Sequence, residues 1–477
     1  MHIYRGKEIK AADAAAEKRG MDTFTLMENA GRSLFMRIRE EVSRDHRILI
    51  LAGKGNNGGD GIVLARYLKN DGYHVDLTFP LGKAATPVAK KHLLYFENCG
   101  YSPTEKSGEY DVIVDSLLGV GTRLPLPNDI VSIIDWINHQ QAMVIAVDVP
   151  TGVLADTGNL DTAVKADWTL SLHGLKPSAF QAGSAEHYGK KEALDIGLKQ
   201  ESNCRIWTKE DVKRTYLKRK EGSHKGTYGT GLLVAGSDEM PGSSLLASVG
   251  AMRAGIGKLT VATTAYVSAI IAGRVPECTY LHDGLSKIAR GHIPEGMKAA
   301  AIGPGLNEPE VIEEALRHLL DSELPVIVDA GALKERNYPK RNAPIILTPH
   351  PGEFSKMTGI PIKDIQQNRI ETARSYAQRQ HVTVVLKGSY TVIAFPDGKV
   401  LVNETGNAGL AKGGTGDTLT GILLAFVSSY SDYKAAVANA VYLHGASADA
   451  WKESKAMAAM LAGDVSENLA AVMKEFE

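Results

Sequence analysis

The stretch Thr405-Gly-Asn-Ala-Gly-Leu-Ala-Lys-Gly-Gly-Thr-Gly-Asp-Thr-Leu-Thr-Gly421 joins a glycine-rich turn to the start of a helix. Gly413, Gly414 and Gly416 have no side chains, so the backbone can turn sharply and bring its N–H groups close to another atom. From Asp417 onward the apolar residues recur at helical spacing, at Leu419, Ile422, Leu423 and Phe426. The glycines are therefore predicted at a helix N-terminus, where free N–H groups and the helix dipole attract an anion.

Asp417 falls in the first turn of this predicted helix. There the same field is expected to keep a carboxylate ionised and able to accept a proton. An anion-binding turn beside a base suits phosphoryl transfer to a hydroxyl group. On these residues alone, a glycine-rich turn in which Asp417 merely favours the helix start remains the alternative.

The composition is that of an ordinary globular protein. Its 477 residues predict two or three domains, and 44% hydrophobic and 23% charged residues fit that class. A net charge of −1 favours neither nucleic acid nor an anionic membrane as a partner. Cys99, Cys204 and Cys278 lie far apart, which argues against a disulfide framework or a zinc motif and fits a reducing compartment. The polar N-terminus and the lack of a long apolar run predict a cytoplasmic protein.

The first half of the chain predicts a βαβ unit. Residues 11–41 have helical spacing, and the apolar run 47–52 is typical of a buried parallel strand. The glycine loop 53–61 follows, then a helix through Leu68 and a strand at 73–79. The order strand, glycine loop, helix, strand predicts a right-handed crossover.

The glycine loop admits more than one interpretation. Gly53, Gly55 and Gly58 satisfy G-x-G-x-x-G, and Asp76 falls near the place of a ribose-binding acid, which suggests a Rossmann dehydrogenase. The loop also carries Asn56, Asn57 and Asp60, whose oxygens can ligate a hard cation or bind a polyhydroxylated ligand. A tight turn with asparagines in left-handed conformations is the structural alternative.

Two further strand ends point to the same crevice. Residues 111–115 and 142–148 are apolar runs that end in Asp115 and Asp148. In an open α/β sheet the carboxyl ends of parallel strands converge, so we expect Asn57, Asp115, Asp148 and Thr151 to meet. The runs 168–174 and 194–198 are predicted to be closing strands.

The second half begins after a basic segment. Residues 199–226 are rich in Lys and Arg, and we interpret them as a solvated linker and helix rather than a nucleic-acid site. Apolar runs then alternate with helical segments, which predicts a second, separate parallel α/β domain. The predicted strands are at 231–236, 259–263, 299–305, 325–330, 345–349 and 382–387, and helices are predicted at 243–254, 308–321 and 364–380.

No Walker A loop is present, so any nucleotide must be held in another way. Three segments that follow predicted strands are candidates: Gly303-Pro-Gly305, His350-Pro-Gly-Glu353 and Lys387-Gly-Ser-Tyr-Thr-Val392. The prolines around His350 suggest a rigid turn that presents the ring to a ligand, although a structural histidine is the alternative. Lys387 could neutralise phosphate, or be an ordinary exposed lysine at a strand end.

Three motifs of the first half resemble a known family: G-K-G-N-N-G-G-D-G at 53–61, G-V-G-T-R-L-P at 119–125 and V-D-V-P-T-G at 147–152. They are similar to the N-terminal domain of the bifunctional NAD(P)H-hydrate repair enzymes, over residues 1–205. The resemblance implies a Rossmann-like three-layer sandwich that interconverts the R and S forms of hydrated NADH or NADPH. It implies substrate contacts at Asn56, Asn57, Gly58, Gly59, Asp60, Gly119, Val120, Gly121, Thr122, Arg123, Leu124, Pro125 and Asp148.

The same resemblance implies a potassium ion held by Asn57, Asp115 and Thr151. The family more often has Ser at position 151, but Thr offers the same hydroxyl and carbonyl. Epimerising a hemiaminal carbon needs a proton relay while the ring opens or loses water, and Asp148 is our hypothesis for the proton-handling group.

The second half resembles the ribokinase-like superfamily, and more closely the C-terminal, nucleotide-dependent dehydratase domain of the same repair enzymes, here expected over residues 206–477. The matching motifs include I-G-P-G-L, T-P-H-P-G-E and K-G-S-Y-T-V together with the opening stretch. Departures occur at Asn307, where the family usually has Gly, and at A-G-I-G-K-L in place of S-G-A-G-L. The resemblance implies a ribokinase-like three-layer sandwich. It implies that Ala251, Gly305, His350 and Asp417 contact the hydrate and that Lys387, Gly388, Ser389, Tyr390, Thr391 and Gly416 contact the nucleotide.

In bacterial members of the family the nucleotide is ADP, with a magnesium ion assisting. Asp417 would then accept the hydroxyl proton as that oxygen attacks the terminal phosphoryl group, and phosphate would leave from the ring. The expected partners are hydrated NADH or NADPH and ADP, with neither nucleic acid nor membrane, and a homo-oligomer is expected. The alternatives are a ribokinase-like small-molecule kinase with a non-catalytic ligand-binding N-terminal domain, and a scaffold role for the first domain.

Overall fold

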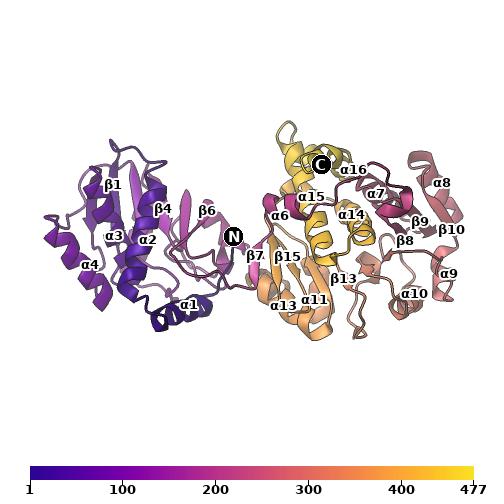
Figure 1. Cartoon of the computed structure of the whole chain (residues 1–477), viewed down its shortest axis with the longest axis horizontal. Coiled ribbons are helices and arrows are strands. Elements are labelled where there is room, and N and C mark those ends of the chain that lie inside the picture. Colours follow the sequence, from indigo (N-terminus) through magenta and orange to yellow (C-terminus); the bar gives the residue numbers. More distant parts are fainter. The chain divides into compact units, whose positions relative to one another are not determined.

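The computed structural model describes residues 1–477 and divides into two compact units, Met1–Arg205 and Ile206–Glu477. Both units are α/β structures built on a mainly parallel sheet, which confirms the predicted fold class (Figure 1). None of the helices combines the length and apolar character needed to cross a bilayer.

The first unit is a six-stranded, wholly parallel sheet with helices on both faces. Its strand order is β2-β1-β3-β4-β5-β6. The strands are β1 (Arg47–Ala52), β2 (His74–Thr78), β3 (Val112–Ser116), β4 (Met143–Val147), β5 (Trp168–Leu172) and β6 (Lys190–Leu194). The helices are α1 (Gly6–Lys18), α2 (Thr23–Ile38), α3 (Asn56–Asn70), α4 (Pro87–Asn98) and α5 (Asn128–Asn138).

Alternate residues of β1 point to opposite faces of this sheet and build two cores. Ile48 and Ile50 pack with α2, α3 and α4, whereas Leu49 and Leu51 pack with α5. Side chains of consecutive strand residues alternate between faces, so a strand buried on both sides is apolar throughout. The unit is therefore a three-layer sandwich, and the carboxyl ends of its strands share one edge.

Two expectations for this unit were wrong. The helix predicted over 11–41 is two helices, because Gly20 turns the chain at φ 97° and the Asp22 side chain accepts a hydrogen bond from Thr25 N at the start of α2. The last strand lies at Lys190–Leu194 rather than 194–198, and Gly197 turns at φ 86° after it. In both places the apolar residues keep a regular spacing on either side of a glycine. The left-handed backbone of that glycine interrupts the helix or strand, which the spacing alone does not reveal.

The second unit contains a ten-stranded sheet with strand order β10-β9-β8-β11-β12-β13-β14-β15-β16-β7. The pairs from β10 to β14 are parallel, whereas β14-β15 and β15-β16 are antiparallel. The strands are β7 (Cys204–Ile206), β8 (Thr230–Val234), β9 (Lys258–Thr263), β10 (Thr279–His282), β11 (Ala299–Ile302), β12 (Val326–Val328), β13 (Ile345–Leu347), β14 (Thr383–Leu386), β15 (Thr391–Ala394) and β16 (Val400–Asn403). The antiparallel hairpin β15-β16 was not among the predicted strands.

Eleven α-helices connect and cover this sheet. They are α6 (Lys209–Thr215), α7 (Pro241–Arg253), α8 (Ala265–Arg274), α9 (Gly284–Ala289), α10 (Pro309–Asp321), α11 (Pro351–Thr358), α12 (Ile362–Gln367), α13 (Arg369–Gln380), α14 (Thr415–Ser429), α15 (Tyr433–Lys452) and, last in the chain, α16 (Ala462–Lys474). The predicted helix 364–380 is divided at Asn368, which lies between α12 and α13.

Helix α14 is buried on nearly all sides and packs closely on α7. A Cβ added at Gly421 would lie 1.9 Å from the Ala247 carbonyl oxygen, and one at Gly250 would lie 2.6 Å from that of Thr418. Only glycine allows the two backbones to approach this closely. The contact joins the first half of α14 to the middle and the C-terminal part of α7.

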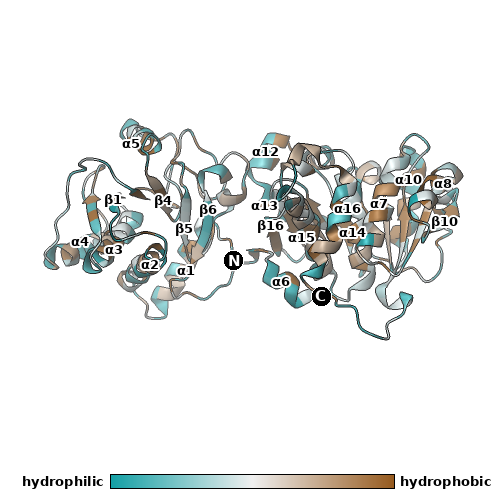
Figure 2. Cartoon of the chain, turned by 90° about the horizontal axis from the view of Figure 1, so that it is seen from above, coloured by the Kyte–Doolittle hydropathy of each residue, from teal (hydrophilic) through white to brown (hydrophobic).

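The basic segment 199–226 is only partly the solvated linker that was predicted. Residues 217–227 are exposed, but Trp207 and Val212 are buried in the core of the second unit. Trp207 Nε1 donates a hydrogen bond to Asn439 Oδ1 over 2.9 Å. Figure 2 shows the short α6 mostly in hydrophilic colours, whereas α7 is largely apolar. Helix α6 therefore packs on the second unit through its few buried residues.

Candidate active sites

The glycine loop of the first unit is packed against the segment that follows β3. A Cβ at Gly58 would lie 1.9 Å from the Gly53 carbonyl oxygen, and one at Gly53 would lie 1.9 Å from that of Leu117. Neither position can therefore hold a side chain. Helix α3 begins directly at Asn56, so the loop is tighter than predicted and its asparagines form the first helical turn.

The three residues predicted to hold potassium are brought together at the ends of β3 and β4. Asp115 accepts hydrogen bonds from Thr151 Oγ1 (2.7 Å), Thr151 N (2.8 Å) and Leu117 N (3.2 Å). Asn57 Nδ2 donates to Leu118 O over 3.1 Å, and Leu118 N donates to Thr151 Oγ1 over 3.0 Å. Asn57 and Thr151 thus share Leu118 as a neighbour, as expected for strand ends that converge.

The Asp115 carboxyl group is completely buried and forms no ion pair with a basic side chain. Burial raises the pKa of Asp115 to about 6, although the hydrogen bonds from Thr151 and Leu117 act in the opposite direction. A buried carboxylate without a cationic partner is costly, and a bound cation would remove that cost. The donor set of carboxylate, hydroxyl and amide oxygens also suits a hard cation.

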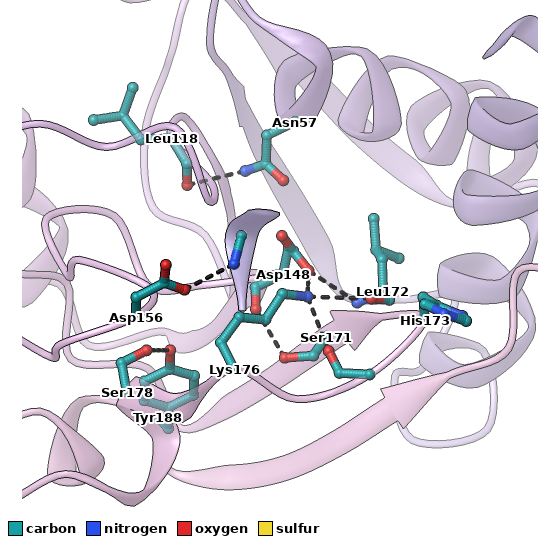
Figure 3. Close-up of polar contacts among 12 residues, drawn as sticks. Asn57, Leu118, Asp148, Asp156, Ser171, Leu172, His173, Lys176, Ser178 and Tyr188 are labelled. Carbon is teal, nitrogen blue, oxygen red and sulfur yellow. Dashed lines mark hydrogen bonds and ion pairs between the residues drawn. The ribbon is translucent and has the colours of Figure 1, made fainter. Parts of the chain in front are cut away.

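Asp148 lies beside these residues in a left-handed backbone conformation, with φ 70°. Its carboxylate oxygen Oδ1 accepts a hydrogen bond from Leu172 N over 3.0 Å and forms an ion pair with Lys176 (Figure 3). Its carbonyl oxygen accepts a hydrogen bond from Ser171 Oγ over 2.8 Å. Such backbone strain at a non-glycine residue persists where the surroundings hold it in place, and it is concentrated at functional sites.

Lys176 was not identified from the sequence. Its side chain is completely buried, and Nζ also donates to Leu172 O (3.1 Å) and Gly174 O (2.9 Å). A lysine after an apolar strand is ordinary in sequence, so nothing in the local pattern could have marked it. The only available signal was its place after β5, at the same sheet edge as Asp148.

The other predicted substrate residues of the first unit line this edge. Asp60 is buried in α3, and Gly119 lies against Asn57, since a Cβ there would be 3.3 Å from the Asn57 side chain. Of residues 120–125, Gly121, Arg123 and Pro125 are exposed and the others half-buried, which leaves this loop accessible to a ligand. The loop and the glycine turn thus lie at the same edge of the sheet.

In the second unit, the glycine turn ends at Gly414, which has φ 91° and precedes the first residue of α14. Lys387 lies directly above the turn, because a Cβ on Gly416 would be 3.2 Å from Lys387 Nζ. The free N–H groups of a helix start and a lysine ammonium therefore face the same place. Together they form an anion site of the kind used for phosphate groups.

Two carboxylates hold the Lys387 ammonium group. Nζ lies 3.1 Å from Asp329 Oδ1 and 3.9 Å from Glu353 Oε2. Thr420 Oγ1, on α14, donates to the other Asp329 oxygen over 2.7 Å. Burial alone would lower the pKa of Lys387, but Asp329 and Glu353 raise it overall, so the lysine is cationic at neutral pH.

Asp417 stands in the first turn of α14, as predicted, but its ionisation differs from the expectation. Burial raises the pKa of Asp417 to about 6, and the neighbouring charges of Asp329 and Glu353 act in the same direction. A hydrogen bond with Ser243 and the charge of Lys387 oppose this rise. The helix field does not keep the pKa low, yet a carboxylate with a pKa near 6 is a better proton acceptor at neutral pH than an ordinary aspartate.

Gly305 joins this group through Ser243. It has φ 65°, and a Cβ there would lie 2.9 Å from Ser243 Cβ and 2.8 Å from the Met240 carbonyl oxygen. Because Ser243 also hydrogen-bonds Asp417, the segment 303–305, the start of α7 and the start of α14 meet at one point.

His350 caps the start of α11 and remains accessible. Its Nδ1 accepts hydrogen bonds from Gly352 N (3.0 Å) and Glu353 N (3.3 Å), while 56% of the side chain is exposed. The remaining ring nitrogen Nε2 lies 3.6 Å from Glu353 Oε1, and Glu353 in turn approaches Lys387. Ala251, by contrast, is completely buried within α7 among core residues.

A second residue that the sequence did not reveal is Arg369, at the start of α13. Its buried guanidinium donates to the carbonyl oxygens of Leu386 (3.0 Å), Lys387 (3.0 Å) and Tyr390 (3.3 Å). It therefore holds the predicted nucleotide segment Lys387-Gly-Ser-Tyr-Thr391 from behind. Bonds to backbone carbonyls do not depend on the side chains of that segment, so no pairing pattern was visible in the sequence.

The structure contains no cluster of three or more His, Cys, Asp or Glu side chains that could hold a metal ion by themselves. Magnesium in nucleotide enzymes is bound by one or two carboxylates together with substrate phosphates and water. The carboxylates around Lys387 fit a magnesium ion only when a nucleotide supplies further oxygens.

Comparison with known proteins identifies both units. The family described as NAD(P)H-hydrate dehydratase matches residues 231–471, and the family described as YjeF-related protein N-terminus matches residues 23–178. The bifunctional NAD(P)H-hydrate repair enzyme Nnr of Moorella thermoacetica is 33% identical over 521 aligned positions, which cover 100% of this chain and 97% of the relative.

Solved structures agree for the second unit. The ADP/ATP-dependent NAD(P)H-hydrate dehydratase of Bacillus subtilis, co-crystallised with ATP and Mg²⁺, is 51% identical, with a TM-score of 0.56 over 57% of this chain and 99% of that chain. A ribokinase-like superfamily protein of Enterococcus faecalis V583 shares the fold, with 24% identity and a TM-score of 0.52 over 58% of this chain and 98% of that chain. These matches confirm the ribokinase-like fold and the resemblance seen in the motifs. The chain belongs to the family of bifunctional NAD(P)H-hydrate repair enzymes.

Proposed function

We propose that this chain repairs hydrated NADH and NADPH in two reactions. The first unit, residues 1–205, epimerises the R and S hydrates, and the second unit, residues 206–477, dehydrates the S hydrate with ADP. The observation that carries the proposal is the meeting of Lys387, Gly416 and Asp417 at the start of α14. A cation, an anion-binding turn and a base in one place are the parts that phosphoryl transfer requires.

In the dehydration, the hydrate hydroxyl loses its proton to Asp417 while its oxygen attacks the terminal phosphorus of ADP, and AMP leaves. This step replaces hydroxide, a poor leaving group, with phosphate. The ring nitrogen then donates its electron pair, the C–O bond to phosphate breaks, and a proton leaves the adjacent ring carbon. The products are NAD(P)H, AMP and inorganic phosphate.

The residues of the second unit take distinct roles in this reaction. Lys387 and the N–H groups of residues 413–416 stabilise charge on the transferred phosphoryl group. Lys387, Gly388, Ser389, Tyr390, Thr391 and Gly416 bind the nucleotide, and Ala251, Gly305, His350 and Asp417 contact the hydrate. Ala251 has no exposed surface, so a contact between Ala251 and the hydrate would require α7 to move. Magnesium would be bound with the nucleotide and neutralise phosphate charge.

In the first unit, Asp148 handles the proton of the hydrate. Residues Asn56 to Asp60 and Gly119 to Pro125 bind the substrate at the carboxyl ends of β1 and β3. Asn57, Asp115 and Thr151 hold a potassium ion, whose charge would stabilise the buried Asp115 carboxylate and the loops around it. We place the reaction in the cytoplasm and expect a homo-oligomer.

One experiment tests both reactions. The protein is incubated with mixed R and S hydrates, magnesium and either ADP or ATP, and NAD(P)H, AMP and free phosphate are measured. Complete recovery of NAD(P)H is expected with ADP. Recovery of only the S fraction would show that the first unit has no epimerase activity. A stable phosphorylated product without free phosphate would support the kinase alternative instead.

A further inference from the structure

The buried ion pair of Asp148 and Lys176 uses every proton donor that the lysine has. Lys176 Nζ donates to Asp148, to Leu172 O over 3.1 Å and to Gly174 O over 2.9 Å (Figure 3). An ammonium group has three N–H donors, so none remains for another carboxyl group. Asp148 is therefore the carboxylate that the lysine neutralises.

A second carboxyl group beside this pair has no such partner. Asp60, on α3, is 8% exposed, and its side chain forms no hydrogen bond and no ion pair. The charged groups that face it are Asp148, Asp13 of α1 and Lys176. The glycines around Asp60 fix its direction, since a Cβ at Gly59 would lie 2.4 Å from the Met27 sulfur and one at Gly61 2.6 Å from Ser116 Oγ.

The charges around Asp60 do not balance if every group is ionised. Three carboxyl groups, those of Asp13, Asp60 and Asp148, share the single ammonium group of Lys176. Burial, followed by the charges of Asp148 and Asp13, raises the pKa of Asp60 well above its usual range. Burial and the lack of a hydrogen bond to the anion therefore favour the protonated form of Asp60.

We propose that Asp60 and Asp148 form an acid–base pair for the epimerisation, with Asp60 as the protonated donor and Asp148 as the ionised acceptor. Lys176 is the positioning residue that keeps the two carboxyl groups in different protonation states. Different environments for two neighbouring carboxyl groups are the usual way in which one site provides both an acid and a base. This inference rests on the epimerase activity proposed above and adds the donor that Asp148 alone cannot supply.

The reaction balances with these two groups. Asp60 gives its proton to the hydroxyl oxygen on the hemiaminal carbon, the C–O bond breaks, and the ring nitrogen donates its electron pair to form an iminium ion and water. Water then adds to the opposite face of that carbon and loses a proton to Asp148. In the reverse direction Asp148, protonated by the forward step, donates and Asp60 accepts. After a forward turnover a proton passes from Asp148 back to Asp60, which restores the resting pair.

The proton on Asp60 can be measured without substrate. In the full-length protein labelled with ¹³C at the aspartate carboxyl groups, NMR titration is expected to show one carboxyl group that stays protonated at pH 7 and disappears in the Asp60→Asn variant. Asp13→Asn removes a neighbouring negative charge and is expected to move that titration to lower pH. Ionisation of Asp60 throughout the range from pH 5 to pH 8 would overturn the proposal.

The rate of epimerisation is then measured against pH, without ADP, by chromatography of the two hydrates. The wild type is expected to lose activity at high pH as Asp60 ionises, and Asp60→Asn to lose about 10²–10⁴-fold in kcat together with that limb of the profile. Asp71→Asn is the matched control, because Asp71 pairs with Arg44 beyond the other end of α3. A wild-type rate in Asp60→Asn would refute the inference alone, whereas a wild type that does not interconvert the hydrates would refute the proposed epimerase and this inference with it.

Discussion

Lys387 and Asp329 form an ion pair of 3.1 Å directly above the glycine turn at the start of α14. Asp329 is 1% exposed and is also bound by Thr420 of α14, so the pair connects the end of β12 to the helix that carries Asp417. A buried lysine held in this way is a fixed positive charge rather than a mobile one.

Replacing the proposed base should remove dehydration while leaving epimerisation intact. For Asp417→Asn we expect kcat of ADP-dependent dehydration to fall about 10²–10⁴-fold, because the hydroxyl proton then has no acceptor. Release of phosphate from the S hydrate measures the loss. Epimerisation by the same protein sample reports that the first unit is folded, and near wild-type dehydration would contradict the role of Asp417.

The pH dependence of dehydration should report the ionisation of Asp417. Since the carboxyl group must be ionised to accept a proton and its pKa is raised to about 6, activity should fall as the pH decreases through that value. The folded state binds this proton more tightly than the unfolded chain does, so its stabilising effect is lost as the pH rises through about 6. Asp417→Asn should therefore unfold at a higher denaturant concentration than the wild type at pH 7. A wild-type kcat/KM that is flat between pH 5 and pH 8 would disagree with this assignment.

Arg369 should act on nucleotide binding through the backbone that it holds. We expect Arg369→Gln to raise the KM for ADP with a smaller effect on kcat, because three carbonyl groups of residues 386–390 lose their donor. Arg369→Lys should restore part of the affinity, since it keeps the charge but not the geometry. Equal KM values in all three proteins would show that the segment holds its shape without the guanidinium.

The contact between α7 and α14 should determine the stability of the second unit. Gly421→Ala places a Cβ 1.9 Å from the Ala247 carbonyl oxygen and should lower the free energy of unfolding by about 1–3 kcal/mol. Gly463→Ala is the control, because its Cβ would meet nothing within 4 Å in α16 and should be neutral or slightly stabilising. Urea denaturation of both variants provides the comparison. Equal midpoints for the two variants would mean that α7 and α14 can move apart without loss of stability.

Potassium should affect the first unit alone. Thr151→Val removes the hydroxyl group that donates to Asp115 Oδ1, and we expect it to weaken the response to potassium in a thermal-shift assay. Replacing potassium with a bulky organic cation should slow epimerisation and leave dehydration of the pure S hydrate unchanged. Identical melting temperatures and rates with and without potassium would show that the first unit does not bind the ion.

Both sheets were largely predictable because local patterns determine them. Buried parallel strands such as Arg47–Ala52 are continuous apolar runs, and the glycines that follow them allow a close turn into a helix. The segment 413–417 was likewise recognisable as a helix start, since glycine spacing and apolar periodicity both depend only on neighbouring residues. The hairpin β15-β16 and the division between α1 and α2 were not, because pairing direction and glycine backbone angles are settled by packing.

The sequence by itself determined the two-unit α/β architecture, the glycine turns and the presence of Asp148, Asp417 and Lys387 at strand or helix ends. Only the tertiary structure decided which groups meet: Lys176 pairs with Asp148, Arg369 binds the backbone of the Lys387 segment, and Asp60 forms neither a hydrogen bond nor an ion pair. It also decided protonation, since the pKa of Asp417 is raised rather than kept low. The physical reason is that partner choice and ionisation depend on burial and on charges brought close from distant parts of the chain, which no local pattern encodes.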